Sequence, residues 1–184
     1  MVDHLDPAPP PPPVDRRAAA KAARKEAAES RVTPGAVPGT DAGPRLDRVA
    51  LEAPGWPTLP ASDAPNFTDA RNITLAPGTK IYRIIDDGSN PAGSYWAFSV
   101  PASEAEWRAG NAVLDNWNND GKYVEYEVPP GPGLNVWAGG TSGQGLSEDG
   151  DPGHVLPGGE QQIWMPSGAV TPSDPQPTPW AARA

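Results

Sequence analysis

The sequence predicts a small α+β domain of about five strands and one clear helix, which occupies residues 74–170. One observation is the uneven spread of the 26 proline and 20 glycine residues among the 184 positions, with proline concentrated at both ends of the chain. The other is that strand-like sequence begins at the turn signal Pro77-Gly78. The hundred or so residues between the ends suffice for one core and one small-molecule site.

The two flanks of this domain are expected to be poorly ordered. Residues 1–73 are interpreted as a Pro/Ala-rich linker, and residues 171–184 as a disordered tail. Within the linker, residues 16–31 are strong helix formers whose only apolar residue is alanine, which fits a solvated helical spacer or a docking helix for a delivery partner. Trp56, Leu59 and Phe67 are the linker residues that could pack onto the edge of the domain.

The expected elements of the domain follow from local patterns. Strands are predicted at residues 79–85, 94–100, 123–128, 134–138 and 160–165. A helix is predicted to begin at a capping box formed by Ser103 and Glu106, with Trp107 to Trp117 supplying one apolar face. Residues 139–159 form a glycine-rich stretch, and its length indicates either a functional loop or a disordered one.

The composition excludes several kinds of site. The chain has no cysteine and only two histidines, His4 and His154, which excludes disulfides, thiol nucleophiles and cysteine or histidine metal clusters. Residues 75–170 contain four basic side chains against twelve acidic ones, and so acidic a domain repels phosphate backbones, which argues against general nucleic-acid binding. No apolar run has the length of a membrane span, and no signal peptide is visible.

In so acidic a domain, each arginine is a candidate anion-binding group. Arg83 lies mid-strand between Ile81 and Ile85, where a guanidinium needs an anion as partner. That anion is either a neighbouring carboxylate or a bound phosphate. Arg108, beside Trp107 in the first helical turn, is either solvated or directed at a pocket.

Two further groups are candidates for ligand contact. Glu160 and Gln162 lie on the same face at the start of the last strand, directly after Gly158-Gly159, and together they predict a polar site. Tyr95 and Trp96 offer flat surfaces for a planar ring, although Trp96 also suits a place in the core.

The order of these segments resembles a known toxin family. The segments KIYRII, EAEWRAGNAV, YVEYEV, NVWAGG and LPGGEQQIW, which lie within residues 79–166, resemble a C-terminal toxin domain of bacterial polymorphic toxins. Within that group the similarity is to the tuberculosis necrotizing toxin family, whose fold is related to the ADP-ribosyltransferase superfamily. The family's histidine after the helix has no counterpart, because residues 103–153 contain no histidine.

The resemblance implies a role for each candidate. Arg83 and Arg108 correspond to the two arginines of the site, with Arg83 on the dinucleotide phosphates. Gln162 corresponds to the glutamine near the scissile glycosidic bond, and Glu160 accompanies it as a second catalytic candidate. Tyr95 and Trp96 are assigned to cofactor binding. NAD or NADP is the expected substrate, and no metal is required.

The resemblance implies an NAD(P) glycohydrolase, which would cleave the nicotinamide–ribose bond. A mono-ADP-ribosyltransferase that modifies a target-cell macromolecule is one alternative, and a non-catalytic β-rich binding or structural module is another. For a toxin we expect a secreted or delivered effector that acts in a target-cell cytoplasm. Its expected partners are a cognate immunity protein and a secretion system or larger toxin scaffold.

Overall fold

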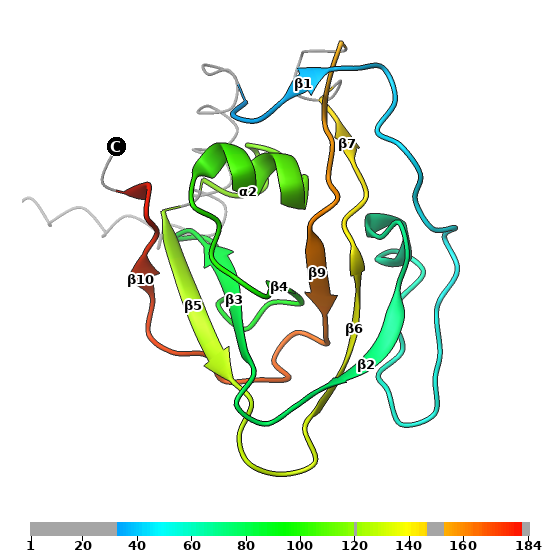
Figure 1. Cartoon of the computed structure of the whole chain (residues 1–184), viewed down its shortest axis with the longest axis vertical. Helices are drawn as coiled ribbons and strands as arrows, with labels where there is room; N and C mark the ends of the chain where they lie inside the picture. Colours follow the sequence, from blue (N-terminus) through cyan, green and yellow to red (C-terminus); the bar gives the residue numbers. More distant parts are fainter. Residues whose placement is uncertain (1–32, 120, 147–152, 182–184) are drawn as a thin grey trace, which may run out of the picture.

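The computed structural model describes residues 33–119, 121–146 and 153–181, and in these the chain is mostly β (Figure 1). Ten strands form two antiparallel sheets: a seven-stranded sheet in the order β10-β5-β3-β4-β9-β6-β2 and a three-stranded sheet in the order β1-β8-β7. The larger sheet consists of β2 (Arg71–Leu75), β3 (Lys80–Ile85), β4 (Tyr95–Ala97), β5 (Lys122–Glu127), β6 (Leu134–Gly140), β9 (Gln161–Trp164) and β10 (Gln176–Pro177). The smaller sheet consists of β1 (Val37–Pro38), β7 (Gln144–Gly145) and β8 (His154–Leu156).

The predicted fold class is therefore wrong. The five expected strands correspond to β3, β4, β5, β6 and β9, but five more strands join them in a mainly β architecture. Four of the additional strands have only two or three residues, which is too short for alternation of apolar and polar residues to be visible. The fifth, β2, has an exposed residue at three of its five positions, so it carries little apolar signal.

The only α-helix in the described residues is α2 (Glu104–Asn111), and it is shorter than predicted. Its start is as expected, because the Ser103 side chain accepts a hydrogen bond from the Glu106 amide. It ends where Ala112 adopts a left-handed conformation, with φ of 49°. The chain then turns sharply, so Trp117 does not share a helical face with Trp107.

The main core lies within the large sheet. Ile81 and Ile85 of β3 pack with Val124 of the neighbouring strand β5 and with Val128, the residue that follows β5. Antiparallel pairing places Ile81 opposite Tyr126 and Tyr82 opposite Glu125. This register fixes which side chains of β3 face the core.

Part of the segment expected to be linker belongs to the fold. Leu59 and Phe67 are fully buried and form a second core cluster with Trp137 and Trp164. The short 3-10 helix η1 (Ala64–Asn66) leads into this cluster, and β2 then pairs with β6 along its whole length. The folded part thus begins before residue 74, and β2 forms one edge of the seven-stranded sheet.

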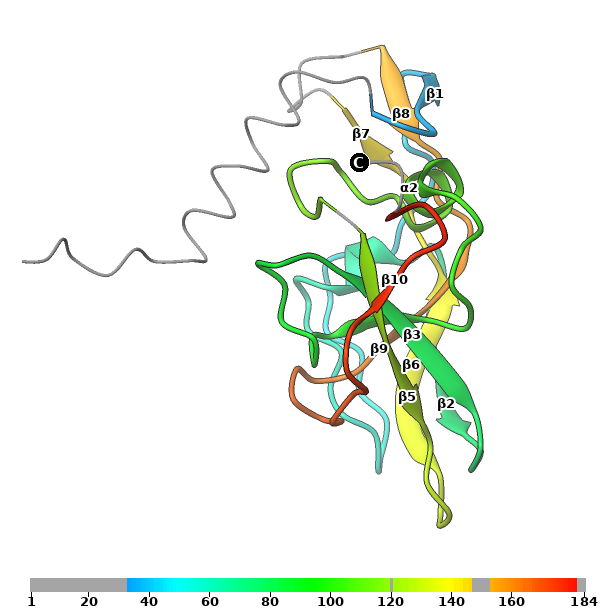
Figure 2. The same ribbon diagram turned by 90° about the vertical axis from the view of Figure 1, so that its left-hand side faces the viewer.

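The expected disordered tail is also folded over residues 171–181. Its strand β10 pairs with β5, and Trp180 is only 7% exposed. The Trp180 ring stacks on Trp107 of α2, with ring centroids 6.2 Å apart and an interplanar angle of 24°. Figure 2 shows this terminal segment beside β5. The predicted helix at residues 16–31 lies outside the described residues.

In the described part of the chain, no helix combines the length and apolar character needed to cross a membrane.

Candidate functional site

A cavity of about 300 Å³ lies where strands β3, β4 and β9 meet the end of α2. The turn that follows α2 supplies one wall, through Ala112, Val113, Trp117 and Asn118. The segment after β6 contributes Thr141 and Ser142. The cavity opens to solvent, because two of its lining residues, Ser99 and Trp117, are exposed. Its volume is at the lower end of the range for small-molecule sites.

Four sequence-predicted residues line this cavity: Arg83, Tyr95, Trp96 and Gln162. They come from three different strands, and Arg83 and Gln162 are 79 positions apart in the chain. Glu160 and Arg108 are not among the lining residues. The structure thus brings together four of the six candidates.

Arg83 lies where the pairing between strands β3 and β4 is unusually short. The ladder between β3 and β4 consists of one pair, Tyr82 with Ala97. Next to that pair, Nη1 of Arg83 donates to the Tyr95 carbonyl over 2.8 Å, and Nε donates to the Asn90 carbonyl over 3.1 Å. Gly93 makes room for this arrangement, since a Cβ there would lie 2.4 Å from Nη2 of Arg83.

The positive charge of Arg83 is not matched by an ion pair with any described residue. Among the described residues no carboxylate lies within 4.0 Å of its guanidinium, and the partners above are neutral carbonyl oxygens. Burial lowers the pKa of Arg83, and the charge of the nearby Asp86 partly offsets this effect. A partly buried guanidinium of this kind is stabilised by an anion.

The rest of the cavity lining is neutral. Of the described residues that line it, Arg83 is the only charged one; the others are apolar, aromatic, hydroxyl or amide side chains. This composition contrasts with the net charge of −9 of the whole chain. The cavity is therefore suited to a ligand that combines an anionic group with an apolar or planar part.

Gln162 is 6% exposed and lies in β9, paired in register with Ala97 of β4 and Gly139 of β6. Its Nε2 donates to the carbonyl of Asn66 over 2.6 Å. This bond fixes the orientation of the amide and ties η1 to the sheet. The amide oxygen is then the group that Gln162 can present to a ligand.

Tyr95 anchors the same segment from β4. Its hydroxyl donates to the Asp63 carboxylate and accepts a hydrogen bond of 2.6 Å from Nδ2 of Asn66. Burial raises the pKa of Tyr95, and the hydrogen bond to Asp63 raises it further. Tyr95 thus contributes a neutral ring to the cavity while its hydroxyl group is used structurally.

Trp96 is mainly a core residue. It is 2% exposed, packs in the main core and donates from Nε1 to the Gly93 carbonyl over 2.8 Å. The expectation that Trp96 suits a place in the core is therefore confirmed. Part of the residue also lines the cavity.

Glu160 is exposed, and its side chain lies over Gly110 of α2, where a Cβ would come within 2.3 Å of the Glu160 Cγ. Its backbone amide donates to the Gly110 carbonyl, and its carbonyl accepts from the Thr141 amide over 2.8 Å. Glu160 therefore joins α2 to the sheet, outside the cavity lining.

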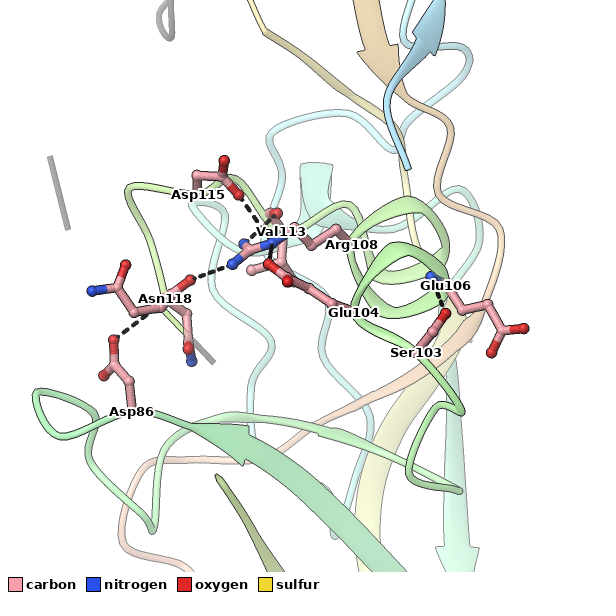
Figure 3. A network of polar contacts seen from close by, with 9 residues as sticks. Asp86, Ser103, Glu104, Glu106, Arg108, Val113, Asp115 and Asn118 are labelled. Atoms are coloured by element: carbon pink, nitrogen blue, oxygen red, sulfur yellow. Dashed lines mark hydrogen bonds and ion pairs between the residues drawn. The ribbon is translucent and has the colours of Figure 1, made fainter. Parts of the chain in front are cut away.

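Arg108 is fully buried and is held by internal partners (Figure 3). Its Nε lies 2.7 Å from Glu104 and 2.9 Å from Asp115. Its two terminal nitrogens donate to the carbonyls of Val113 and Asn118, over 3.3 and 2.9 Å. Neither expected environment, solvent or a pocket, describes this side chain, because it connects α2 to the turn at residues 113–118.

The sequence did not identify several lining residues. Trp117 was placed on the apolar face of a helix, and Asn66 in a linker. Trp107, expected in the core, lines the cavity and is 5% exposed. Only the glycine-rich character of residues 139–159 hinted that Ser142, within that stretch, would lie at a site.

Within the described residues, no group of three or more histidine, cysteine, aspartate or glutamate side chains is arranged to hold a metal ion.

No protein-family model matches the chain, and no curated protein matches it in sequence. Among solved structures, Tne2 in complex with Tni2 is similar over 60% of this chain and 93% of that chain, with 18% sequence identity and a TM-score of 0.44. A likeness of this size assigns no activity to the chain.

Proposed function

We propose that this protein is an effector domain that cleaves the nicotinamide–ribose bond of NAD or NADP. The observation that carries the proposal is the composition of the cavity, where one partly buried arginine without an ion-pair partner among the described residues lies among neutral and aromatic side chains. A dinucleotide offers the matching chemistry, since it joins planar rings to an anionic pyrophosphate. The resemblance of residues 79–166 to NAD-consuming toxin domains supports the same substrate.

The proposed reaction is a hydrolysis. The bond between ribose C1′ and the nicotinamide nitrogen breaks, and its electron pair remains on the nitrogen, which neutralises the pyridinium charge. The ribosyl carbon passes through an oxocarbenium-like state, water adds to it, and a proton leaves to solvent. The products are nicotinamide and ADP-ribose, or its phosphorylated form from NADP.

The lining residues would act by positioning and charge stabilisation. Arg83 would hold the pyrophosphate. The oxygen of the Gln162 amide, whose nitrogen is fixed on Asn66, would face the ribose and stabilise positive charge on it or orient the water. Glu160 and Arg108 take no direct part in this proposal.

We further propose that the protein is delivered into a target-cell cytoplasm and that a cognate immunity protein protects the producing cell. A domain that consumes NAD is harmful to any cell that makes it, so an inhibitor is expected. The acidic character of the chain favours basic residues on that inhibitor.

The experiment is to incubate the purified 184-residue chain with NAD, and separately with NADP, and to measure nicotinamide release by chromatography. We expect release by the wild type, at least a hundredfold less by Arg83→Ala, and a strong decrease for Gln162→Ala. Arg71→Ala is the matched control, because this arginine is 79% exposed in its side chain and pairs with Asp69 outside the cavity.

The other outcomes contradict the proposal. Binding of NAD without release indicates the non-catalytic module. Release that requires a cell lysate, with label entering macromolecules, indicates ADP-ribosyl transfer. An Arg83→Ala variant as active as the wild type removes the assigned role of the cavity.

A further inference from the structure

Trp117 differs from the other tryptophans of the described chain. It is 48% exposed, whereas Trp56 is half-buried and the other five tryptophans are each 7% exposed or less. It also lines the cavity, where it belongs to the turn that forms one wall. An indole kept at a cavity mouth is a surface on which a planar ring can stack.

The turn that carries Trp117 is fixed on both sides. The Trp117 amide donates to the Leu114 carbonyl over 3.0 Å. Two positions before it, Asp115 is 2% exposed and pairs with the Arg108 guanidinium; directly after it, the Asn118 carbonyl accepts from the same guanidinium. Figure 3 shows the pairs of Arg108 with Asp115 and Asn118.

The wall is also tied to strand β3. Nδ2 of Asn118 donates to the Ile84 carbonyl over 3.3 Å, next to Arg83 in the chain. The position of Trp117 is thus set relative to β3, the strand that carries Arg83. With Trp117 and Arg83 fixed in this way, the indole can hold a planar ring and the guanidinium can hold an anionic group of the same ligand.

We infer that Trp117 is a binding residue, which stacks on the planar ring of a nucleotide whose phosphate is held by Arg83. The inference rests on the proposed function for the class of ligand, but it is a statement about binding and not about turnover. Arg108 then acts as a positioning residue, because it holds the turn from which Trp117 projects.

The test is a set of calorimetric titrations of the full-length chain with NAD, AMP, nicotinamide mononucleotide and inorganic pyrophosphate. Trp117→Ala is expected to weaken NAD binding about 10- to 100-fold, which corresponds to the loss of one base–aromatic stack. Pyrophosphate, which has no ring, should bind within about twofold of its wild-type affinity. Trp117→Phe should recover most of the NAD affinity.

Phe98→Ala is the matched control, since Phe98 is 41% exposed and is not among the lining residues. The Phe98→Ala substitution should change neither the affinity for NAD nor the affinity for pyrophosphate. The ratio of the AMP and mononucleotide losses in Trp117→Ala identifies which ring of the dinucleotide is stacked.

The outcomes that overturn the inference are specific. Unchanged NAD binding by Trp117→Ala overturns it, and so do equal losses of NAD and pyrophosphate, which indicate a general disturbance of the site. A wild type that binds none of the nucleotides overturns it as well. A wild type that binds NAD but releases no nicotinamide ends the glycohydrolase proposal and leaves the role of Trp117 in place.

Discussion

Nη1 of Arg83, on strand β3, donates to the main-chain carbonyl of Tyr95 on the neighbouring strand β4 over 2.8 Å. A main-chain amide is the usual donor to such a carbonyl. Here the β3–β4 ladder is limited to Tyr82 and Ala97, and the guanidinium satisfies the carbonyl instead. The guanidinium proposed to bind an anion is therefore held by main-chain carbonyls, which pre-organises it before a ligand arrives.

Gly93→Ala should weaken anion binding with little loss of stability. The added Cβ would lie 2.4 Å from Nη2 and 2.6 Å from Cζ of Arg83, so the guanidinium has to move. The atoms in the way belong to the end of a flexible side chain, so we expect unfolding to become easier by only about 1 kcal/mol. Pyrophosphate affinity, measured by calorimetry, should fall at least tenfold.

Gly145→Ala is the control for that substitution, because nothing lies within 4 Å of a Cβ at this position. It should leave both stability and affinity near the wild-type values. A Gly93→Ala protein that binds pyrophosphate normally would show that the placement of the guanidinium does not matter.

The sequence predicted residues of the cavity lining where alternation and residue chemistry agree. Arg83 in a strand of isoleucines and Gln162 at the start of the last strand were both identified, because a polar group in a predicted buried strand requires an explanation. The capping box at Ser103 and the strand at residues 123–128 were predicted for equally local reasons.

The features that depend on tertiary contacts were not predicted. Arg108 has the sequence signature of an exposed helical arginine, yet its partner Asp115 lies beyond the helix end at Ala112. Strands such as β10 and β1 exist only because longer strands offer them an edge. The place of Trp117 follows from the left-handed turn at Ala112, which no propensity of alanine indicates.

Arg108→Met should destabilise the fold by about 3–5 kcal/mol. The substitution leaves Asp115, which is 2% exposed, without its cation and removes the donors to the Val113 and Asn118 carbonyls. Urea unfolding followed by circular dichroism measures the loss. Lys122→Met is the control, because its pair with Asp87 is exposed and contributes less than about 1 kcal/mol.

The double variant Arg108→Met/Asp115→Asn separates charge from packing in this network. Removing the uncompensated carboxylate should restore part of the stability that Arg108→Met loses. If the double variant is less stable than the single one by the full cost of Asp115→Asn alone, the two residues do not interact energetically.

Trp180→Ala should destabilise the protein by about 3–5 kcal/mol, because it empties the space beside Trp107 and Ile84. Trp180→Phe should cost less than about 2 kcal/mol, since the indole Nε1 has no hydrogen-bond partner among the described residues and the substitution breaks no such bond. Thermal unfolding of the two variants makes the comparison. Equal stability of Trp180→Ala and the wild type would show that the terminal segment is dispensable.

Tyr95 should make the stability of the fold fall at high pH. Burial raises its pKa above the ordinary value of 10.0, and the Asp63 hydrogen bond adds to the effect. Below pH 10.0 the phenol is neutral in both the folded and the unfolded protein, so it causes no pH dependence of the stability. Above it, the unfolded chain loses the proton first, and stability therefore falls as pH rises, by about 1.4 kcal/mol per pH unit.

Tyr95→Phe tests this linkage through urea unfolding between about pH 8 and pH 11. At pH 8 the variant should be less stable by about 1–3 kcal/mol, because the Asp63 carboxylate and the Asn66 amide lose their shared partner. Its stability should then decline less steeply above pH 10 than that of the wild type, so the two curves converge. Parallel curves across the whole range would mean that Tyr95 ionises with an ordinary pKa and that its hydroxyl group is not enclosed between sheet and η1.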